Sequence, residues 1–204
     1  LVIEGARGNF CAGADITQFE DAAPTTEPDR RHFEFIRDYP TPVIAKVRGY
    51  CLGGGLETAM SCDFRFVSED ATLGLPEVDL GILPGAGGVQ FISRLADPST
   101  AMEIAMTGDH ISAERAAEAG IVNRVYPDDE LDDAVEEFAE TTASKPPLSV
   151  QGIKQSSNLA TEVGLEEGLK YDRTLIEPLF GTEDHEEGVR AFSEDDYEPE
   201  FKGR

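Results

Sequence analysis

Residues 53–63 read Gly53-Gly54-Gly55-Leu56-Glu57-Thr58-Ala59-Met60-Ser61-Cys62-Asp63, and the rest of the chain is organised around this stretch. It follows residues 42–49, an apolar run that predicts a buried strand closing in a turn. It continues as an apolar run that predicts the first turns of a helix. Three glycines between a strand and a helix allow another part of the backbone to come close. The helix start also leaves amide N–H groups without partners inside the helix.

This glycine stretch has two interpretations. In the functional one, the free N–H groups stabilise an oxygen that becomes negative during a reaction, and Glu57 places a carboxylate beside it. In the structural one, the glycines only permit a tight turn, and Glu57 only complements the helix dipole. A short glycine-rich stretch does not separate the two by itself, so the choice depends on the rest of the chain.

The composition describes an α/β protein with an acidic surface. At 204 residues the chain is long enough for one domain with a helical appendage. The 41 acidic and 17 basic residues give a net charge of −24, which repels nucleic acid and anionic membranes. No apolar stretch in the sequence is long enough to cross a bilayer. We therefore predict neither a nucleic-acid partner nor a membrane partner.

The basic residues are unusual because only five of them are lysines, at positions 46, 145, 154, 170 and 202. Such lysine-poor acidity resembles that of proteins from salt-loving organisms, in which high ionic strength screens the repulsion between carboxylates. We predict a halophilic protein.

The cysteines and histidines do not indicate a metal site. Cys11, Cys51 and Cys62 are odd in number and lack the spacing of a metal site or a disulfide framework. We expect reduced, buried thiols, as in a cytoplasmic protein. The three histidines are scattered, and we expect them to be surface or packing residues.

The pattern along the chain predicts a core, residues 1–135, followed by a C-terminal helical region, residues 136–204. The chain opens on a strand without a preceding turn, which predicts that the sequence begins inside a domain. Further elements expected in the core are a helix at 29–39, a helix at 98–106, a helix at 113–119 with Ser112 as its N-cap, and a strand at 121–125.

Three features of the first ninety residues bear on chemistry when they are taken together. A loop of small residues ends at Ala14-Asp15, the triple glycine leads to Glu57, and Pro76-Glu77 places a second carboxylate 20 residues after the first. Two loops with free N–H groups and two carboxylates would form an oxyanion hole beside an acid/base pair. Spacing alone does not show that they converge.

At these residues the chain resembles the enoyl-CoA hydratase/isomerase, or crotonase, family. The resemblance extends over almost the whole chain, in the order expected of the family. Its main motifs are Phe10-Cys11-Ala12-Gly13-Ala14-Asp15-Ile16, Pro42-Val43-Ile44-Ala45, Gly49-Tyr50-Cys51-Leu52-Gly53-Gly54-Gly55-Leu56-Glu57, Cys62-Asp63, Leu73-Gly74-Leu75-Pro76-Glu77 and Gly81-Ile82-Leu83-Pro84-Gly85-Ala86-Gly87-Gly88.

The resemblance implies an α/β fold, a spiral of repeated ββα units with a C-terminal helical region. It also implies assembly as homotrimers that pair into homohexamers, and acyl-CoA thioesters as substrates. Coenzyme A is then part of the substrate, and no separate cofactor and no metal is expected. The segment that carries an early adenosine-binding strand and loop in the family would precede Leu1.

The resemblance also assigns roles to individual residues. The backbone N–H groups of Ala14 and Gly54 match the two donors of the family's oxyanion hole. Asp15, Ile16 and Thr17 match the continuation of its substrate-binding loop. Glu57 and Glu77 match the two glutamates with which hydratases add water to a 2-enoyl-CoA: the first would deprotonate the water, and the second would protonate the α-carbon.

Other functions remain open at this point. Isomerases of the family often keep only one of the two glutamates, so the pair favours hydration over isomerisation or the dehydration of a short 3-hydroxyacyl-CoA. A non-enzymatic binding or scaffold role is disfavoured by the acidic charge and by the intact pair. The sequence departs from the family at Val89-Gln90-Phe91, where relatives often have Thr-Gln-Arg, and at residues 193–199, where a basic run is common.

Overall fold

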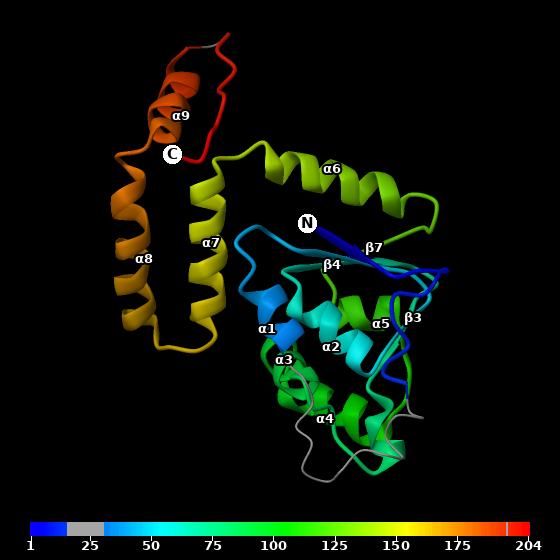
Figure 1. Ribbon diagram of the computed structural model, residues 1–204. Coiled ribbons are helices and arrows are strands. Elements are labelled where there is room, and N and C mark those ends of the chain that lie inside the picture. Colours follow the sequence, from blue (N-terminus) through cyan, green and yellow to red (C-terminus); the bar gives the residue numbers. More distant parts are fainter. Residues whose placement is uncertain (16–30, 195) are drawn as a thin grey trace. The chain divides into compact units, whose positions relative to one another are not determined.

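The computed structural model describes residues 1–15, 31–194 and 196–204. The chain forms two compact units. The first contains residues 1–39 and 43–135, and the second contains residues 40–42 and 136–204. Each unit is described separately below (Figure 1).

The larger sheet of the first unit has four parallel strands. Its order is β1 (Val2–Glu4), β2 (Ile44–Val47), β4 (Phe64–Ser68) and β7 (Arg124–Tyr126). The central strands β2 and β4 are buried almost throughout. Most of their residues are apolar, as in parallel strands that are covered on both faces, although β2 contains Lys46 and β4 contains Arg65. The strand predicted at the start of the chain is confirmed as β1.

A second sheet carries the glycine stretch. Strand β3 (Tyr50–Leu52) pairs in parallel with β5 (Thr72–Gly74), which pairs antiparallel with β6 (Ile111–Ser112). A single parallel bridge between Cys11 and Cys51 adds the segment before Ala14 to the free side of β3. The two loops that the sequence singled out thus leave neighbouring strands.

The remaining elements of the first unit are short helices. Helix α2 contacts β3, β4 and the helices α1 and α3, so it lies at the centre of the unit. The helices are α1 (Arg31–Arg37), α2 (Gly54–Ser61), the 3₁₀ helix η2 (Pro76–Leu80), α3 (Gly88–Leu95), α4 (Pro98–Thr107) and α5 (Ala113–Glu118). The helices predicted at 98–106 and 113–119 are confirmed, and the Ser112 hydroxyl accepts the cap hydrogen bond from Arg115 N–H, at 3.1 Å.

The strand predicted at residues 121–125 is only partly correct. The observed strand β7 begins at Arg124, because the N–H groups of Ile121 and Val122 both donate to the carbonyl of Ala116, at 2.8 and 3.3 Å. These two residues close the end of α5 instead of joining the sheet. Their burial, which suggested a strand, comes from packing in the core.

The second unit consists mainly of helices. Helix α6 (Leu131–Ala143) leads into it, and α7 (Pro147–Ala160) and α8 (Leu165–Leu179) then pack side by side (Figure 1). Helix α9 (Glu183–Ser193) is followed by a tail that returns along it: the buried Asp184 carboxylate accepts from the N–H groups of Lys202 and Gly203, at 2.6 and 2.8 Å. No helix in the described ranges has the length and apolar character of a membrane span.

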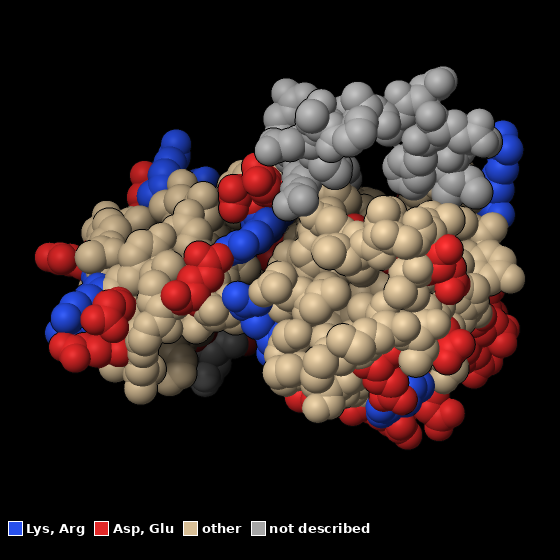
Figure 2. Space-filling model, turned by 90° about the horizontal axis from the view of Figure 1, so that it is seen from below, with Lys and Arg blue, Asp and Glu red and all other residues tan. Residues whose placement is uncertain are grey.

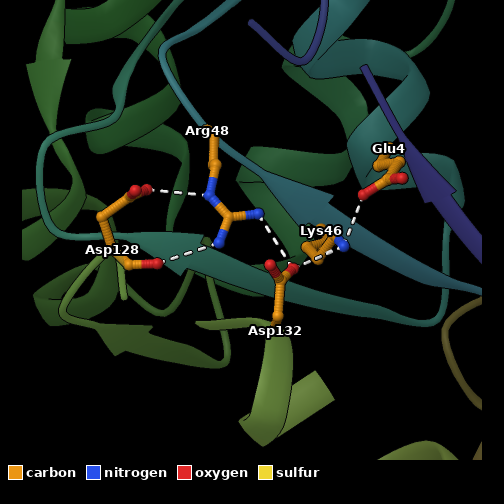
Figure 3. Close-up of polar contacts among 5 residues, drawn as sticks. All are labelled: Glu4, Lys46, Arg48, Asp128 and Asp132. Carbon is orange, nitrogen blue, oxygen red and sulfur yellow. Dashed lines mark hydrogen bonds and ion pairs between the residues drawn. The ribbon is translucent and has the colours of Figure 1, made fainter. Parts of the chain in front are cut away.

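A network of ion pairs fastens the start of α6 to the larger sheet (Figure 3). On β2, Lys46 pairs with Glu4 of β1 and with Asp132 of α6, the latter at 2.6 Å. Arg48 pairs with Asp132 at 3.1 Å and with the Asp128 carboxylate at 2.8 Å. Hydrogen bonds from Lys46 and Arg48 lower the pKa of the Asp132 carboxyl below its usual value. Two of the few cations of the chain are used in this way.

Acidic side chains cluster elsewhere on the surface, with basic groups scattered between them (Figure 2). Because the net charge is −24, we expect the melting temperature to rise between low salt and molar KCl. Exposed ion pairs contribute only about 0–1 kcal/mol each, so the loss of their attraction is smaller than the gain from screening the repulsion among the carboxylates. Thermal unfolding followed by circular dichroism measures this change in melting temperature.

A melting temperature that stays constant or falls with added salt would contradict a halophilic protein. A Lys46→Met variant, which loses one branch of the network, should show the same rise from a lower starting point.

Candidate active site

The three glycines have three different structural roles. Gly53 is the N-cap of α2 and has φ +53° and ψ −126°, a conformation that side chains disfavour. Gly54 is the first residue of α2, so its N–H has no partner within the helix. At Gly55 a Cβ atom would lie 2.1 Å from the carbonyl oxygen of Cys11, which is closer than atoms can approach. The close approach predicted from the sequence is therefore confirmed at Gly55.

The backbone that passes Gly55 is the loop carrying Ala14. Hydrogen bonds from Cys11 N–H to Tyr50 O, at 3.0 Å, and from Leu52 N–H to Cys11 O, at 2.9 Å, fix this segment beside β3. Gly13 has φ +102°, so the chain turns sharply just before Ala14. The structure thus brings the loop of Ala14 next to the start of α2. Asp15 is the last residue before the gap, and Ile16 and Thr17 lie outside the described residues.

Glu57 is buried in the first turn of α2, with 4% of its surface exposed. Its Oε1 atom accepts two hydrogen bonds, from Ala86 N–H at 2.7 Å and from Gly88 N–H at 2.9 Å. Two backbone donors on one oxygen fix the orientation of the carboxylate. Glu57 therefore does more than complement the helix dipole.

Ala86 and Gly88 were given no role by the sequence reasoning. The signal was present as the second glycine-rich run, residues 81–88, but a loop before a helix explained it equally well. Gly87 has φ +111° and is the N-cap of α3, which begins at Gly88. The same principle operates here as in the first run, since unpaired N–H groups at a helix start bind an anion. In this case the anion is the side chain of Glu57.

Glu77 lies in η2, and its carboxylate faces the N-cap of α2. A Cβ atom on Gly53 would come within 3.1 Å of Glu77 Oε1. Glu77 Oε2 is buried and accepts no hydrogen bond from any described residue. Burial raises the pKa of the Glu77 carboxyl, and the negative charge of Glu57 raises it further. A hydrogen bond from the backbone N–H of Glu77 to its own carboxyl lowers this pKa, but the net result is an increase. The two glutamates thus lie close enough to interact but in opposite environments.

The raised pKa predicts a pH-dependent effect of Glu77→Gln on stability. A carboxyl whose pKa is raised in the folded state stabilises the folded protein fully at pH values below the pKa of the unfolded chain, 4.5. This contribution is lost as the pH rises through the folded-state pKa. The glutamine amide cannot ionise. The melting temperature of Glu77→Gln minus that of wild type should therefore increase from pH 4 to pH 8. Paired thermal melts across this range measure the difference. A difference independent of pH would show that the carboxyl is not perturbed.

Space is available beside these groups. A Cβ atom built on Gly54 meets no atom of the described residues within 4 Å, whereas those on Gly53 and Gly55 meet side chain or backbone. A reacting group could therefore approach the Gly54 N–H, with the carboxylates of Glu57 and Glu77 on the same end of α2. Such an arrangement can stabilise a developing oxyanion and move protons beside it.

The cysteines and histidines have structural surroundings. The three cysteines are free thiols, and burial raises the pKa of Cys51 above its usual range. His110 packs edge-on against the Tyr50 ring, and His185 packs against Phe180. Within the part of the chain that the structure describes, no group of three His, Cys, Asp or Glu residues is arranged to hold a metal ion.

Solved structures of other proteins have the same fold. An enoyl-CoA hydratase subunit from Geobacillus kaustophilus superimposes with a TM-score of 0.93 at 37% identity, covering 100% of this chain and 80% of that one. The enoyl-CoA hydratase from Bacillus anthracis gives 0.92, also at 37% identity, covering 100% of this chain and 81% of that one. The protein therefore has the crotonase fold, and the predicted α/β class is confirmed.

The sequence comparisons identify the protein family within this fold. The chain belongs to the enoyl-CoA hydratase/isomerase family, whose sequence model matches residues 1–204. It is 39% identical over 206 residues to the 2,3-dehydroadipyl-CoA hydratase of Escherichia coli, covering 100% of this chain and 80% of the relative. It is 38% identical over 200 residues to a probable mitochondrial enoyl-CoA hydratase of Dictyostelium discoideum, covering 95% and 71%.

Proposed function

We propose that the protein is an enoyl-CoA hydratase, which adds water across the double bond of a 2-enoyl-CoA thioester. The observation that carries the proposal is that Glu57 and Glu77 both lie at the N-terminus of α2. Glu57 Oε1 accepts from two backbone donors, whereas Glu77 Oε2 is buried and accepts no hydrogen bond from any described residue. Relatives that match 95% or more of the chain bear hydratase names.

Glu57 acts as the base in this proposal. Its Oε1 accepts hydrogen bonds from the N–H groups of Ala86 and Gly88, which fix the orientation of the carboxylate. Its Oε2 then accepts a hydrogen bond from the attacking water. As the water oxygen bonds to the β-carbon of the substrate, its proton passes to Glu57.

Glu77 acts as the acid. Burial and the charge of Glu57 raise its pKa, which favours the protonated form needed to deliver a proton to the α-carbon. The raised pKa of Glu77 assigns the acid role to this residue and leaves the role of base to Glu57. The net reaction adds one hydrogen and one hydroxyl from a single water molecule, so no cofactor beyond the coenzyme A of the substrate is required.

The N–H groups of Ala14 and Gly54 form the oxyanion hole for the thioester oxygen. Negative charge develops on that oxygen when water attacks the β-carbon, and donors fixed beforehand stabilise it without reorganising. The dipole of α2 adds to this at Gly54. Asp15, Ile16 and Thr17 continue as the substrate-binding loop.

The experiment that tests this function measures turnover of three substrates by the wild-type protein. Loss of the enoyl-thioester absorbance of crotonyl-CoA reports hydration, and its appearance from 3-hydroxybutyryl-CoA reports the reverse dehydration. Conversion of a 3-enoyl-CoA to its 2-enoyl isomer reports isomerisation. We expect hydration to have the highest kcat/KM. Isomerisation faster than hydration would replace the proposal, and no turnover together with retention on immobilised RNA at high salt would favour a binding role.

We further propose that the protein is a cytoplasmic homotrimer or homohexamer. Exposed apolar side chains on η2, on the loop after it and on α4 support association, because such residues are costly to leave in water. They are Val78, Leu80, Ile82, Leu83, Met102 and Met106. Sedimentation equilibrium distinguishes these states from a monomer.

A further inference from the structure

The segment that carries Ala14 is attached to β3 over a very short length. Only one bridge, Cys11 with Cys51, joins them. It consists of the hydrogen bonds from Cys11 N–H to Tyr50 O and from Leu52 N–H to Cys11 O. One further backbone bond, from Phe10 N–H to Arg48 O at 2.8 Å, lies just before the bridge. A typical backbone hydrogen bond contributes little net stability, so three of them fix the register of such a short pair only weakly.

A side chain supplies a further contact beside these backbone bonds. The N–H of Tyr50, the first residue of β3, donates to the Oδ1 atom of Asn9 at 2.9 Å. In a regular parallel ladder a backbone carbonyl would accept this bond. Here the Asn9 amide oxygen takes its place, two residues before the bridge.

The backbone opposite Asn9 leaves room for this contact. A Cβ atom on Gly49 would lie 2.4 Å from Asn9 Oδ1 and 2.4 Å from the carbonyl oxygen of Gly8. Gly49 also has φ +55°, which side chains disfavour. The turn between β2 and β3 therefore accommodates the Asn9 side chain only because residue 49 is glycine.

The register of this pair matters because each strand leads to one donor of the proposed oxyanion hole. The Asn9 segment continues through Gly13 to Ala14, and β3 continues directly to Gly54. A shift by one residue would displace one donor relative to the other by about 3.3 Å. A much smaller displacement, about 1 Å, is enough to cost roughly 100-fold in rate at a positioned site.

We propose that Asn9 is a positioning residue for the hydration reaction. Its amide oxygen fixes the register of the Ala14 loop against β3, and through it the spacing between the Ala14 and Gly54 N–H groups. Asn9 does not touch the substrate. The inference rests on the proposed function, since it assumes that these two N–H groups bind the thioester oxygen.

The test compares Asn9→Ala and Asn9→Leu, which lose the acceptor, with Asn9→Asp, which keeps an oxygen at the same position. For the first two we expect kcat on crotonyl-CoA to fall about 10-fold or more while KM changes less than about threefold, because the damage is to transition-state stabilisation. Asn9→Asp should restore most of kcat. Hydrogen exchange at the Tyr50 amide should be faster in Ala and Leu variants than in wild type.

Asn123→Ala is the matched control. Asn123 Oδ1 accepts the Arg65 N–H at 2.8 Å, the same kind of bond, on β4 of the other sheet. It should lower the melting temperature and leave kcat per folded molecule unchanged. Wild-type kcat in a folded Asn9→Ala or Asn9→Leu would overturn the inference, as would equal losses of kcat in the Asp variant or in Asn123→Ala. Wild-type turnover in Gly54→Pro would instead show that the proposed oxyanion hole is wrong.

Discussion

Replacing Glu57 by Gln is expected to lower kcat for hydration of crotonyl-CoA by roughly 10²–10⁴-fold, the contribution that a positioned acid or base commonly makes. The amide keeps the volume of the carboxylate, and its oxygen can still accept the N–H groups of Ala86 and Gly88. The fold should therefore survive. What is lost is the ability to take a proton from water, and the enoyl-thioester absorbance measures the rate.

Replacing Glu77 by Gln should cause a loss of similar size at the other proton transfer. The two variants can be separated by exchange of the α-hydrogen of a saturated acyl-CoA in deuterated water, a reaction that needs a group at the α-carbon but no attacking water. We expect Glu77→Gln to abolish this exchange and Glu57→Gln to affect it less.

A control for both variants is Glu114→Gln, which changes an exposed glutamate in the first turn of α5. It should retain wild-type kinetics. If either Glu57→Gln or Glu77→Gln also hydrates crotonyl-CoA at the wild-type rate, the role given to that residue is wrong. If both do so, the proposed chemistry is wrong and the site must be sought elsewhere.

The second large effect is expected for Gly54→Pro. Proline has no N–H, so the variant lacks one donor of the proposed oxyanion hole, and the loss of a single such donor costs about 10²–10³-fold in kcat. Gly54 is the first residue of α2, the position at which a helix tolerates proline best. The variant can therefore fold while losing the donor, and circular dichroism checks that it does.

Gly54→Ala is the comparison variant for this experiment. It restores the N–H, and its Cβ meets no atom within 4 Å in residues 1–15, 31–194 and 196–204. We expect it to retain far more activity than Gly54→Pro, with any loss appearing mainly in KM, since the added methyl group faces the space proposed for substrate. Equal loss in the two variants would mean that crowding, and not the missing donor, explains the proline result.

Local rules were sufficient for much of the fold. The start of α2 after three glycines, the cap at Ser112 and the strands β1 and β2 depend on residues close together in the sequence, and each was predicted from them. The strand predicted at 121–125 was partly wrong, because the apolar character of Ile121 does not reflect membership of a strand. Its burial comes from the core, and its N–H is used to close α5. An apolar pattern indicates burial but does not say which partner takes the backbone hydrogen bond.

The glycine stretch around which the sequence is organised shows where local information ends. The sequence by itself determined that Gly53, Gly54 and Gly55 permit a close approach at a helix start, with a carboxylate at Glu57, because conformational freedom and helix geometry are properties of neighbouring residues. Only the tertiary structure decided which backbone approaches, which donors hold Glu57, and that Glu77 faces Gly53 with an unpaired oxygen. These contacts join residues that are 24 to 44 positions apart, and they form only when β3 pairs with its neighbours and the chain packs around α2.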